Sequence, residues 1–414
     1  MIEWSEQHQM IRDTVRRFID AEIVPHLDEL EHGDLPPYDI LRKLYSTFGI
    51  DELARARFDQ QIERERQGLP AREKPADAGA RAGRGDQAAM TLIPIIELCR
   101  YCPGMVTAMG VSSGLTASAV MSKGTLEQKV RWGRDLLTLD KIGAWAITEP
   151  GSGSDAFGGM KATARREGDT FVLNGSKTFI TNGPYADTIV FICKLEEPGI
   201  DQRDRKILHF VLDRGMPGLV QTKPLRKMGL HSSPTGELFL TDVRCGIEHL
   251  LGGERSLASE RGVGRAGARD TFSMERSGIA AMALGIVEQC LALSVKYARE
   301  RVQWDKPIGE YQLIQEKLAR MEVARMNLQN LVFRLIELAS NGRSMNFAEA
   351  SAMKLYAARA AVEVAMEAVQ VYGGNGYMAE YRVEQLARDA KVLQIYAGTD
   401  EIQIREIARE LLRG

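Results

Sequence analysis

Cysteine is scarce in this chain, and neither sign of charge predominates. Only five of the 414 residues are cysteine, an odd number that argues against a disulfide framework and predicts a cytoplasmic protein. The 54 Lys and Arg residues nearly balance 56 Asp and Glu residues, so we expect no nucleic-acid or membrane partner. No apolar run approaches the roughly 20 residues of a membrane helix. The acidic start, Met1 to Glu6, is unlike a signal peptide.

Clustered metal ligands are also missing from the sequence. The six histidines are scattered, and Cys99 and Cys102 have no second pair nearby, so no metal is expected. The segment Gly110–Gly114 has the spacing of a hydrolase nucleophile elbow, which requires a strand before it and a helix after it. Both flanks have helical character, so we interpret the segment as helix packing.

The periodicity of apolar residues predicts three successive domains in an α+β multi-domain fold. Residues 1–140 are expected to form a helical domain, with a flexible, Ala-, Gly- and Arg-rich insertion at about 70–88. Residues 141–255 are expected to form a β domain. Residues 256–414 contain three long helical patterns and are expected to form a four-helix-bundle domain.

The β domain is expected to be an antiparallel barrel or sandwich, because no helix-length segment separates its strands. The dipeptide Asn174–Gly175 favours a hairpin turn, so two strands are predicted within Thr170–Thr181. Further strand-like segments are found at Ala144–Thr148, Thr188–Cys193, Ile207–Leu212 and Glu237–Val243.

Three local motifs suggest chemistry, each beside a structural alternative. Glu149–Asp155 follows a predicted strand, and its glycines would let backbone N–H groups approach an anion or a flat ring; it could equally be a tight turn. Arg299–Trp304 could contact phosphate through arginine, or could simply compensate the dipole of a helix C-terminus. Glu275 and Arg276 begin an apolar helix, where a carboxylate ordinarily caps or stabilises the helix.

Together these segments make the chain resemble the acyl-CoA dehydrogenase family. The resemblance extends over nearly the whole chain, in order, and it is carried by five separated motifs: Trp145–Asp155, Asn174–Gly183, Arg301–Gln312, Gln370–Tyr377 and Arg388–Thr399. It implies FAD as cofactor and a fatty acyl-CoA that is dehydrogenated to the trans-2-enoyl-CoA, with flavin N5 accepting the hydride. It also implies a homotetramer and an electron-transfer flavoprotein as electron acceptor.

The resemblance implies roles for individual residues. Cofactor contacts are implied near the flavin for Trp145, Ala146, Ile147, Thr148, Ser154, Phe179, Ile180 and Thr181, and at the pyrophosphate for Thr399 and Glu401. Contacts to a cofactor shared between subunits are implied for Arg301, Gln303, Trp304, Gln312, Gln370, Gly373 and Gly374. Substrate contacts are implied for Ser154, Phe272, Arg276, Ala397 and Gly398.

The chain also departs from the family pattern. Many members place the catalytic glutamate directly before the Gly-Thr of the last motif, where this chain has Ala397. In the isovaleryl and long-chain branches the base precedes an arginine on the helix that starts near Phe272, and Glu275–Arg276 fits that arrangement. We therefore expect Glu275 to be the α-proton base. Phe179 replaces a usual tryptophan and Trp304 a usual phenylalanine.

Two other functions remain open on the sequence. The chain could be a flavin-dependent monooxygenase or oxidase with the same fold, or a non-catalytic subunit of a mixed oligomer. Intact cofactor motifs and an available base favour the dehydrogenase. Because Ala397 leaves room beside the reacting carbons, branched-chain or medium-to-long acyl groups are expected to be better substrates than butyryl-CoA.

Overall fold

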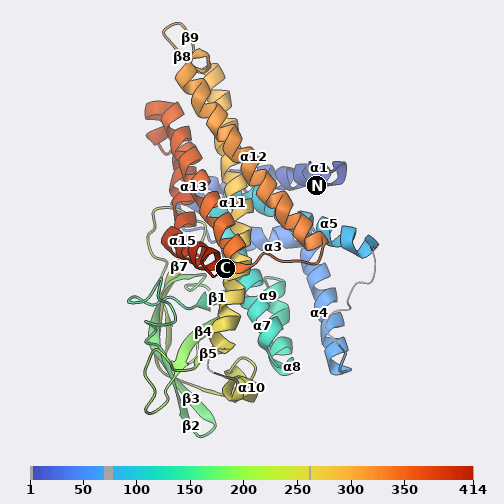
Figure 1. Ribbon diagram of the computed structural model, residues 1–414, viewed down its shortest axis with the longest axis vertical. Coiled ribbons are helices and arrows are strands. Elements are labelled where there is room, and N and C mark those ends of the chain that lie inside the picture. The colour runs from blue at the N-terminus through green and yellow to red at the C-terminus, as the bar shows by residue number, and fades with distance from the viewer. Residues whose placement is uncertain (1–2, 70–77, 261–262, 414) are drawn as a thin grey trace.

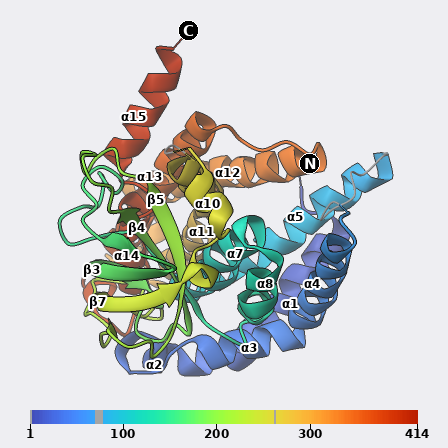
Figure 2. The same cartoon turned by 90° about the horizontal axis from the view of Figure 1, so that it is seen from below.

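Helices from both ends of the chain pack beside and above a β-sheet formed by its middle, which lies at the lower left in Figure 1. The computed structural model describes residues 3–69, 78–260 and 263–413. The first helices wrap around one side of the molecule (Figure 2), and the last ones form an elongated bundle (Figure 1). This order of helical, β and helical regions confirms the predicted fold class.

In its described part, the N-terminal region consists of helices joined by short connections. Ser5 caps the first helix by accepting a hydrogen bond from the His8 backbone N–H, and Gly49, in a left-handed conformation, separates the third and fourth helices. The helices are α1 (Glu6–Glu22), α2 (Leu27–His32), α3 (Tyr38–Thr47), α4 (Ile50–Arg66), α5 (Ala78–Cys99), α6 (Pro103–Met109), α7 (Ala117–Lys123), α8 (Leu126–Gln128) and α9 (Arg134–Leu137).

The structure corrects one prediction for this region and confirms another. Residues 70–77 of the expected insertion lie outside the described part, but from Ala78 onward the segment belongs to α5, so the prediction of an irregular segment over 78–88 was wrong. Gly110–Thr116 is a π-helical turn between two helices, which confirms that the elbow-like spacing belongs to helix packing.

The middle of the chain forms one seven-stranded sheet. Its strands are β1 (Gly143–Ala146), β2 (Thr163–Glu167), β3 (Thr170–Thr181), β4 (Thr188–Leu195), β5 (Ile207–Asp213), β6 (Leu219–Gln221) and β7 (Thr235–Gly246). The order is β1-β4-β2-β3-β7-β6, and β5 pairs with the other edge of β4. The β1–β4 and β2–β4 pairs are parallel, so the prediction of a purely antiparallel arrangement was wrong.

The predicted hairpin at Asn174–Gly175 was also wrong. Both residues lie inside the single long strand β3, at an irregularity in its pairing with β7. A Cβ on Gly175 would stand 2.6 Å from the Cβ of Ala162, and the Asn174 side chain exchanges hydrogen bonds with Asp242. The same dipeptide that favours a tight turn therefore serves here in a β-bulge, where glycine permits a close approach.

The C-terminal region is a long helical bundle. Its helices are α10 (Glu254–Ala258), α11 (Val263–Glu300), α12 (Gln312–Ser340), α13 (Phe347–Tyr372), α14 (Val383–Lys391) and α15 (Asp400–Leu411), with a small hairpin of β8 (Val302–Gln303) and β9 (Lys306–Pro307). One apolar core joins α11, α12 and α13 to α1 and α5, and a second lies within the sheet.

Two helical segments have the length and apolar character of membrane helices, Pro103–Lys123 and Gly278–Glu300. The expectation that no run approaches that length was therefore wrong. Their most apolar windows are 56% and 67% buried inside the protein, as in core helices of a folded domain.

Candidate active site

A cavity of about 1290 Å³ opens where the three regions meet. Its walls come from the end of β1 and the loop after it, the end of β3, the π-helical turn Gly110–Thr116, the first part of α11 and the loop before α15. Most of the exposed wall is apolar, and cationic side chains, among them Arg203, Arg405 and Arg409, also contribute to it.

A buried ion pair positions the end of β1. The Lys177 ammonium donates to Glu149 Oε1 at 2.8 Å and to the Ile147 carbonyl at 3.0 Å. Glu149 also accepts from the backbone N–H groups of Lys161 and Ala162, at 2.7 and 3.0 Å. Burial lowers the pKa of Lys177, and Glu149 opposes that shift. These contacts hold the Ile147–Thr148 segment against the cavity.

The end of β3 forms another wall and contains a conformationally restricted residue. Phe179 has φ +57°, a left-handed value that is unfavourable for a large side chain, and its side chain remains 69% exposed at the cavity. The following residues are anchored, because the Asn182 amide donates to the carbonyls of Ala108 and Gly143, both at 2.9 Å.

Glu275 projects from α11 into the cavity wall, next to two cations. It is partly buried, and burial raises its pKa to about 7, although the charges of Arg276 and Lys354 act to lower it. Arg276 is buried, stacks over the Phe347 ring at 4.1 Å and donates to Ser351 Oγ at 3.0 Å. A carboxyl group with a pKa near neutrality is suited to accept a proton at physiological pH.

The loop before α15 faces Glu275 and is held by donors behind it. Ala397 and Gly398 have φ values of +53° and +93°. Arg276 Nε donates to the Ala397 carbonyl at 3.1 Å, and the Gln403 amide donates to the carbonyls of Ala397 and Gly398 at 3.1 and 2.7 Å. A left-handed alanine is costly, so these bonds are what keep the turn in this conformation.

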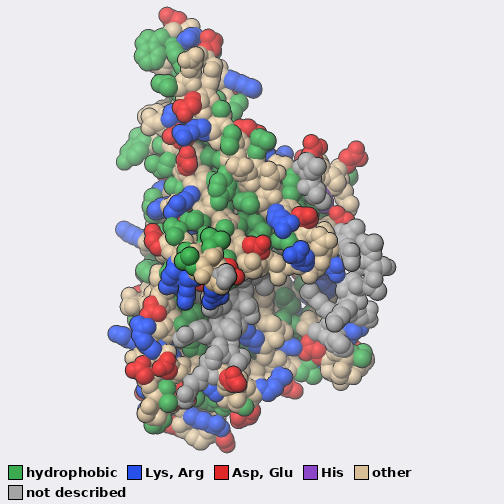
Figure 3. Space-filling model, in the orientation of Figure 1, with side chains coloured by type: hydrophobic (Ala, Val, Ile, Leu, Met, Phe, Trp, Pro, Cys, Tyr) green, Lys and Arg blue, Asp and Glu red, His purple; other side chains and the backbone are tan. Residues whose placement is uncertain are grey.

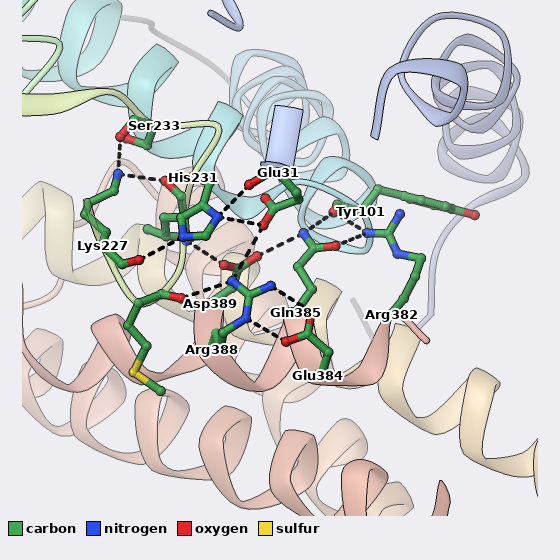
Figure 4. Close-up of polar contacts among 12 residues, drawn as sticks. Glu31, Tyr101, Lys227, His231, Ser233, Arg382, Glu384, Gln385, Arg388 and Asp389 are labelled. Carbon is green, nitrogen blue, oxygen red and sulfur yellow. Dashed lines mark hydrogen bonds and ion pairs between the residues drawn. The ribbon is translucent and has the colours of Figure 1, made fainter. Parts of the chain in front are cut away.

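A third wall is tied to the N-terminal region by a polar network (Figure 4). The Asp389 carboxylate on α14 accepts from the Leu230 backbone N–H at 2.5 Å, and Arg388 donates to the Met228 carbonyl at 3.0 Å. His231 contacts the Glu31 carbonyl oxygen at 2.6 Å. The loop that contributes Lys227, Met228, Gly229, Leu230 and Ser233 to the cavity is thereby fixed between α2 and α14.

The structure brings many of the predicted site residues together. Those that line the cavity are Trp145, Ile147, Thr148, Ser154, Phe179, Ile180, Thr181, Glu275, Arg276, Ala397, Gly398 and Thr399. Ala146 alternates with its neighbours and packs into the core of the sheet, and Glu401 is exposed on the first turn of α15. The side chain of Phe272 lies outside the described part of the structure.

The remaining predicted residues lie far from this cavity. Trp304 and Asp305 form the turn of the β8–β9 hairpin, at the far tip of α11 and α12 (Figure 1), and Trp304 is 84% exposed. Arg301, Gln303, Gln312, Gln370, Gly373 and Gly374 belong to the same end of the bundle and do not line the cavity. Within one chain, the two predicted groups of cofactor contacts are therefore separate.

Sequence reasoning missed several wall residues. Thr107, Val111 and Leu115 line the cavity at helical spacing, beside the glycines whose elbow-like pattern had suggested helix packing only. Lys354 and Gln403, which hold the loop before α15, gave no signal, because a lysine or a glutamine within a helical pattern is usually on the surface.

The cavity fits a flat cofactor with a polar edge. The indole Nε1 of Trp145 and the hydroxyl of Ser233 are buried without a hydrogen-bond partner among the described residues, and both residues line the cavity. The nearby Thr148, Ser154 and Thr181 add hydroxyl groups, while Ile147 and Phe179 add apolar faces. These groups suit the ring system of a flavin, whose heteroatoms need hydrogen bonds at one edge.

Each of the three regions that meet at this cavity matches a domain model of one enzyme family. Residues 5–51, 144–243 and 262–412 match the N-terminal, middle and C-terminal domain models of acyl-CoA dehydrogenases. The chain belongs to the acyl-CoA dehydrogenase family, whose members are FAD-containing oxidoreductases.

Relatives cover the chain nearly end to end. An acyl-CoA dehydrogenase of Bacillus subtilis is 36% identical, covering 99% of both chains, and a 3-(aryl)acrylate reductase of Clostridium sporogenes is 34% identical, covering 99% of this chain and 100% of the relative. The three-dimensional structure of butyryl-CoA dehydrogenase from Megasphaera elsdenii superposes with a TM-score of 0.80 at 31% identity, covering 100% of both chains.

Two further solved structures bear on cofactor and partner. An acyl-CoA dehydrogenase of Bacillus anthracis complexed with FAD superposes with a TM-score of 0.79 at 28% identity, covering 99% of this chain and 68% of the other. A chain from a study of the electron transferring flavoprotein of Acidaminococcus fermentans superposes with a TM-score of 0.79 at 31% identity, covering 100% of both chains.

Proposed function

We propose that this enzyme removes hydrogen from the α and β carbons of a fatty acyl-CoA, with Glu275 as the base that takes the α proton. The observation that carries the proposal is Glu275 itself, a carboxyl group in the cavity wall with a pKa of about 7, opposite a loop position occupied by Ala397. Alanine cannot accept a proton, so Glu275 supplies the carboxylate at this point of the cavity.

Each wall of the cavity has a part in this reaction. Removing an α proton from a thioester requires stabilisation of the negative charge that develops on its oxygen. The turn at Ala397–Gly398 lines the same cavity as Glu275, and its backbone N–H groups are the proposed donors to that oxygen. Ile147, Phe179 and Thr181 would hold the FAD ring, and bound FAD would supply the hydride acceptor for the β carbon. The apolar walls exclude water from the reacting atoms.

The test is a Glu275→Gln variant, which retains shape and volume but not basicity. We expect normal FAD content and a fall in turnover of about 10²- to 10⁴-fold, the usual contribution of a general base. Glu288→Gln is the matched control, because Glu288 lies on the same helix but pairs with Arg12 at 2.8 Å, away from the cavity. Glu275→Gln turnover within about tenfold of wild type would remove Glu275 from this role.

Anaerobic mixing of the wild-type protein with acyl-CoA separates the proposal from its alternatives. A dehydrogenase bleaches its flavin without oxygen and passes the electrons to an added acceptor. An oxidase or monooxygenase would turn over only when oxygen is supplied. A non-catalytic subunit would leave the flavin oxidised under both conditions.

We also propose the kind of substrate. Ala397 leaves volume beside the α and β carbons, and Val111 and Leu115 provide an apolar wall, so branched or medium-to-long acyl groups are expected to be preferred. Each methylene in an apolar pocket contributes roughly 1 kcal/mol, so a difference of several methylenes separates good from poor substrates by orders of magnitude in kcat/KM.

A panel of substrates tests this preference. Because the relatives include a butyryl-CoA dehydrogenase and a 3-(aryl)acrylate reductase, the panel contains butyryl-, isovaleryl-, palmitoyl- and 3-phenylpropionyl-CoA. The preference is wrong if butyryl-CoA proves best.

The proposal extends to the surroundings of the enzyme. An electron-transfer flavoprotein is the proposed acceptor, supported by the similarity to a chain from a study of such a protein. A homotetramer is proposed because the residues at the far end of the bundle, Trp304 among them, are exposed in one chain and resemble cofactor contacts. A cytoplasmic location agrees with five cysteines that are all free and buried.

A further inference from the structure

A fully buried lysine lies behind the turn that faces Glu275. Lys354, in the middle of α13, has no exposed side-chain surface. Its Nζ donates to the Gly398 carbonyl at 2.8 Å and lies 3.7 Å from Asp400 Oδ1. Burial lowers the pKa of Lys354 to about 8, while the charges of Asp400 and Glu275 act to raise it. Lysine is almost never buried completely without a specific partner.

Hydrogen bonding of the turn does not by itself require this lysine. The Gly398 carbonyl already accepts from the Gln403 amide at 2.7 Å, and the Ala397 carbonyl accepts from Arg276 and Gln403. An apolar side chain of the same length would fill the space without the cost of burying an ammonium group. The position of the charge, beside both the turn and Glu275, therefore calls for a functional explanation.

The donors behind the turn determine which way its N–H groups point. In a trans peptide the carbonyl and the N–H point in opposite directions. Because the carbonyls of Ala397 and Gly398 are directed at Arg276, Gln403 and Lys354, the N–H groups of Gly398 and Thr399 point away from these donors. Donors on a carbonyl also polarise its peptide group and strengthen the N–H on the other side.

The charges around the turn nearly cancel. Arg276 and Lys354 are the cations, and Glu275 and Asp400 are the carboxylates. Asp400 is also paired from the outer side by Arg359, at 3.0 Å. When an acyl thioester loses its α proton, Glu275 becomes neutral and the negative charge moves to the substrate oxygen. Arg276 and Lys354 then remain to balance that charge.

We propose that Lys354 is a positioning residue for the reaction: it adds a charged donor to the left-handed turn at Ala397–Gly398 and supplies the positive charge that favours the ionised substrate. The inference rests on the proposed function, since it concerns the same deprotonation step. Lys354 acts through the turn and through the field at Glu275.

The first test compares Lys354→Met with Arg359→Met. Methionine preserves the length and apolar stem of lysine but has neither charge nor donor. Arg359 lies on the same helix and pairs with the same Asp400, but among the described residues it donates no hydrogen bond to the carbonyls of Ala397 or Gly398. For Lys354→Met we expect a fall in kcat of about 10- to 100-fold, less than the about 10²- to 10³-fold loss on removing a donor that contacts the oxyanion directly. KM for a saturated acyl-CoA should change little. Arg359→Met should leave both parameters near wild type.

The pH profile of kcat/KM provides a readout that a merely structural role would not move. The wild type should lose activity below about pH 7, as Glu275 becomes protonated, and above about pH 8, as Lys354 loses its charge. In Lys354→Met the alkaline limb should disappear and the acid limb should move to higher pH, because a cation that favours ionised Glu275 is gone. An unchanged profile in this variant would overturn the proposal.

Binding of a 3-oxoacyl-CoA gives a second readout without turnover. Such a thioester ionises readily to an enolate, so it should depend on the charge of Lys354 more than a saturated acyl-CoA does. We expect Lys354→Met to weaken 3-oxoacyl-CoA binding at least tenfold more than it weakens saturated acyl-CoA binding, measured by equilibrium dialysis. Equal weakening of both ligands would contradict the proposal.

Two further measurements make the result decisive. If Lys354→Met does not fold, Lys354→Gln replaces it, since glutamine keeps a donor to Gly398 but carries no charge. This variant should still move the acid limb of the kcat/KM profile to higher pH. An unmoved acid limb would overturn the proposal. The wild-type protein provides the separate control on the proposed function. If acyl-CoA fails to reduce its flavin, the function itself is wrong, whereas normal wild-type reduction with an unaffected Lys354→Met variant contradicts only the role of Lys354.

Discussion

At the residue scale, buried charge is concentrated around the cavity. Lys177, Arg276 and Lys354 are all buried, and each contacts the backbone of a segment that lines the cavity. Replacing such an ion pair by apolar groups is often neutral for stability, while breaking it is costly. All three donate to the backbone of Ile147, Ala397 or Gly398. We therefore infer that their role is to position the backbone that lines the cavity.

The pair of Lys177 and Glu149 leads to a prediction about cofactor retention. Lys177→Met leaves a buried carboxylate unpaired, which should lower the free energy of unfolding by about 3–5 kcal/mol and weaken FAD binding. Adding Glu149→Leu removes the unpaired charge and should recover part of that stability. It should not restore FAD binding, because the Ile147 carbonyl still lacks its donor. Urea denaturation and the FAD content of purified protein measure the two effects. Full recovery of FAD content in the double variant would contradict a positioning role for the pair.

At the element scale, α11 crosses α5 at a glycine. A Cβ on Gly285 would stand 2.2 Å from the Ile96 carbonyl oxygen and 2.8 Å from the Cβ of Cys99, whereas a Cβ on Gly278 meets nothing within 4 Å. The two glycines lie on the same helix two turns apart. Only Gly285 is therefore required by packing.

This contrast predicts opposite effects of the same substitution. Gly278→Ala should stabilise the protein by about 0.5–1 kcal/mol, because alanine favours helix over glycine. Gly285→Ala should destabilise it by about 1–3 kcal/mol, because the two helices must move apart. The midpoints of urea denaturation compare the two variants directly. Destabilisation of equal size in both would show that helix crossing does not distinguish them.

Elements with strong periodicity could be predicted from the sequence, and those that depend on neighbours could not. Phe347–Tyr372 forms one of the long helices predicted within residues 256–414, because its apolar residues recur at helical spacing. The β2 strand was missed, because Thr163–Glu167 is short and charged at its exposed end. The parallel pairing of β1 with β4 depends on contacts between distant segments, which a local pattern does not contain.

The same distinction applies to the cavity. Trp145 and Thr181, which belong to recognisable motifs, line it. Thr107 and Lys227 line it as well, but they reach it from elements whose own sequences are typical of a buried helix and of an irregular loop. Lys354 is less predictable still, because its burial depends on where α13 packs against the loop before α15.

At the scale of the whole molecule, two buried carboxyl groups join the N-terminal and C-terminal regions. Burial and the neighbouring Asp389 raise the pKa of Glu31 to about 8, and burial also raises the pKa of Asp389 (Figure 4). Arg388, 3.7 Å from Glu31, opposes the shift. Two carboxylates in one buried site resist double ionisation, so the folded protein holds a proton that the unfolded chain would release.

This proton predicts how stability depends on pH. The Glu31 carboxyl group has a higher pKa in the folded protein than the value of about 4.5 in the unfolded chain. Its contribution to stability is therefore fully present below about pH 4.5. The contribution is lost as pH rises through about 8. The free energy of unfolding should therefore fall between about pH 5 and pH 8 in the wild type, and fall less in Glu31→Gln. Glu29→Gln, an exposed carboxylate on the same helix, should follow the wild type. Parallel curves for all three proteins would exclude this contribution.

Apolar side chains on the upper bundle are consistent with contacts between subunits (Figure 3). Exposed large residues there include Trp304 on the β8–β9 hairpin, Leu313 on α12, Met366 on α13 and Tyr377 just after α13, with Trp304 and Tyr377 more than 80% exposed. The cofactor-like residues Arg301 and Gln370 belong to this end and do not line their own chain's cavity. If they bind FAD, they do so in another subunit.

Subunit complementation tests this arrangement. Glu275→Gln lacks the base but keeps Arg301, and Arg301→Ala binds FAD poorly but keeps Glu275. Either variant alone should therefore have little activity.

In a mixed dimer with shared sites, one site combines the intact Glu275 of one chain with the intact Arg301 of the other. Random pairing makes about half of the dimers mixed, and one of the two sites in each is complete, so co-expression should restore about a quarter of wild-type activity. If each site were formed by a single chain, every subunit would contain one defect and co-expression would restore nothing. Mixing the separately purified homo-oligomers without subunit exchange should also remain inactive, which separates complementation from simple addition of residual activities.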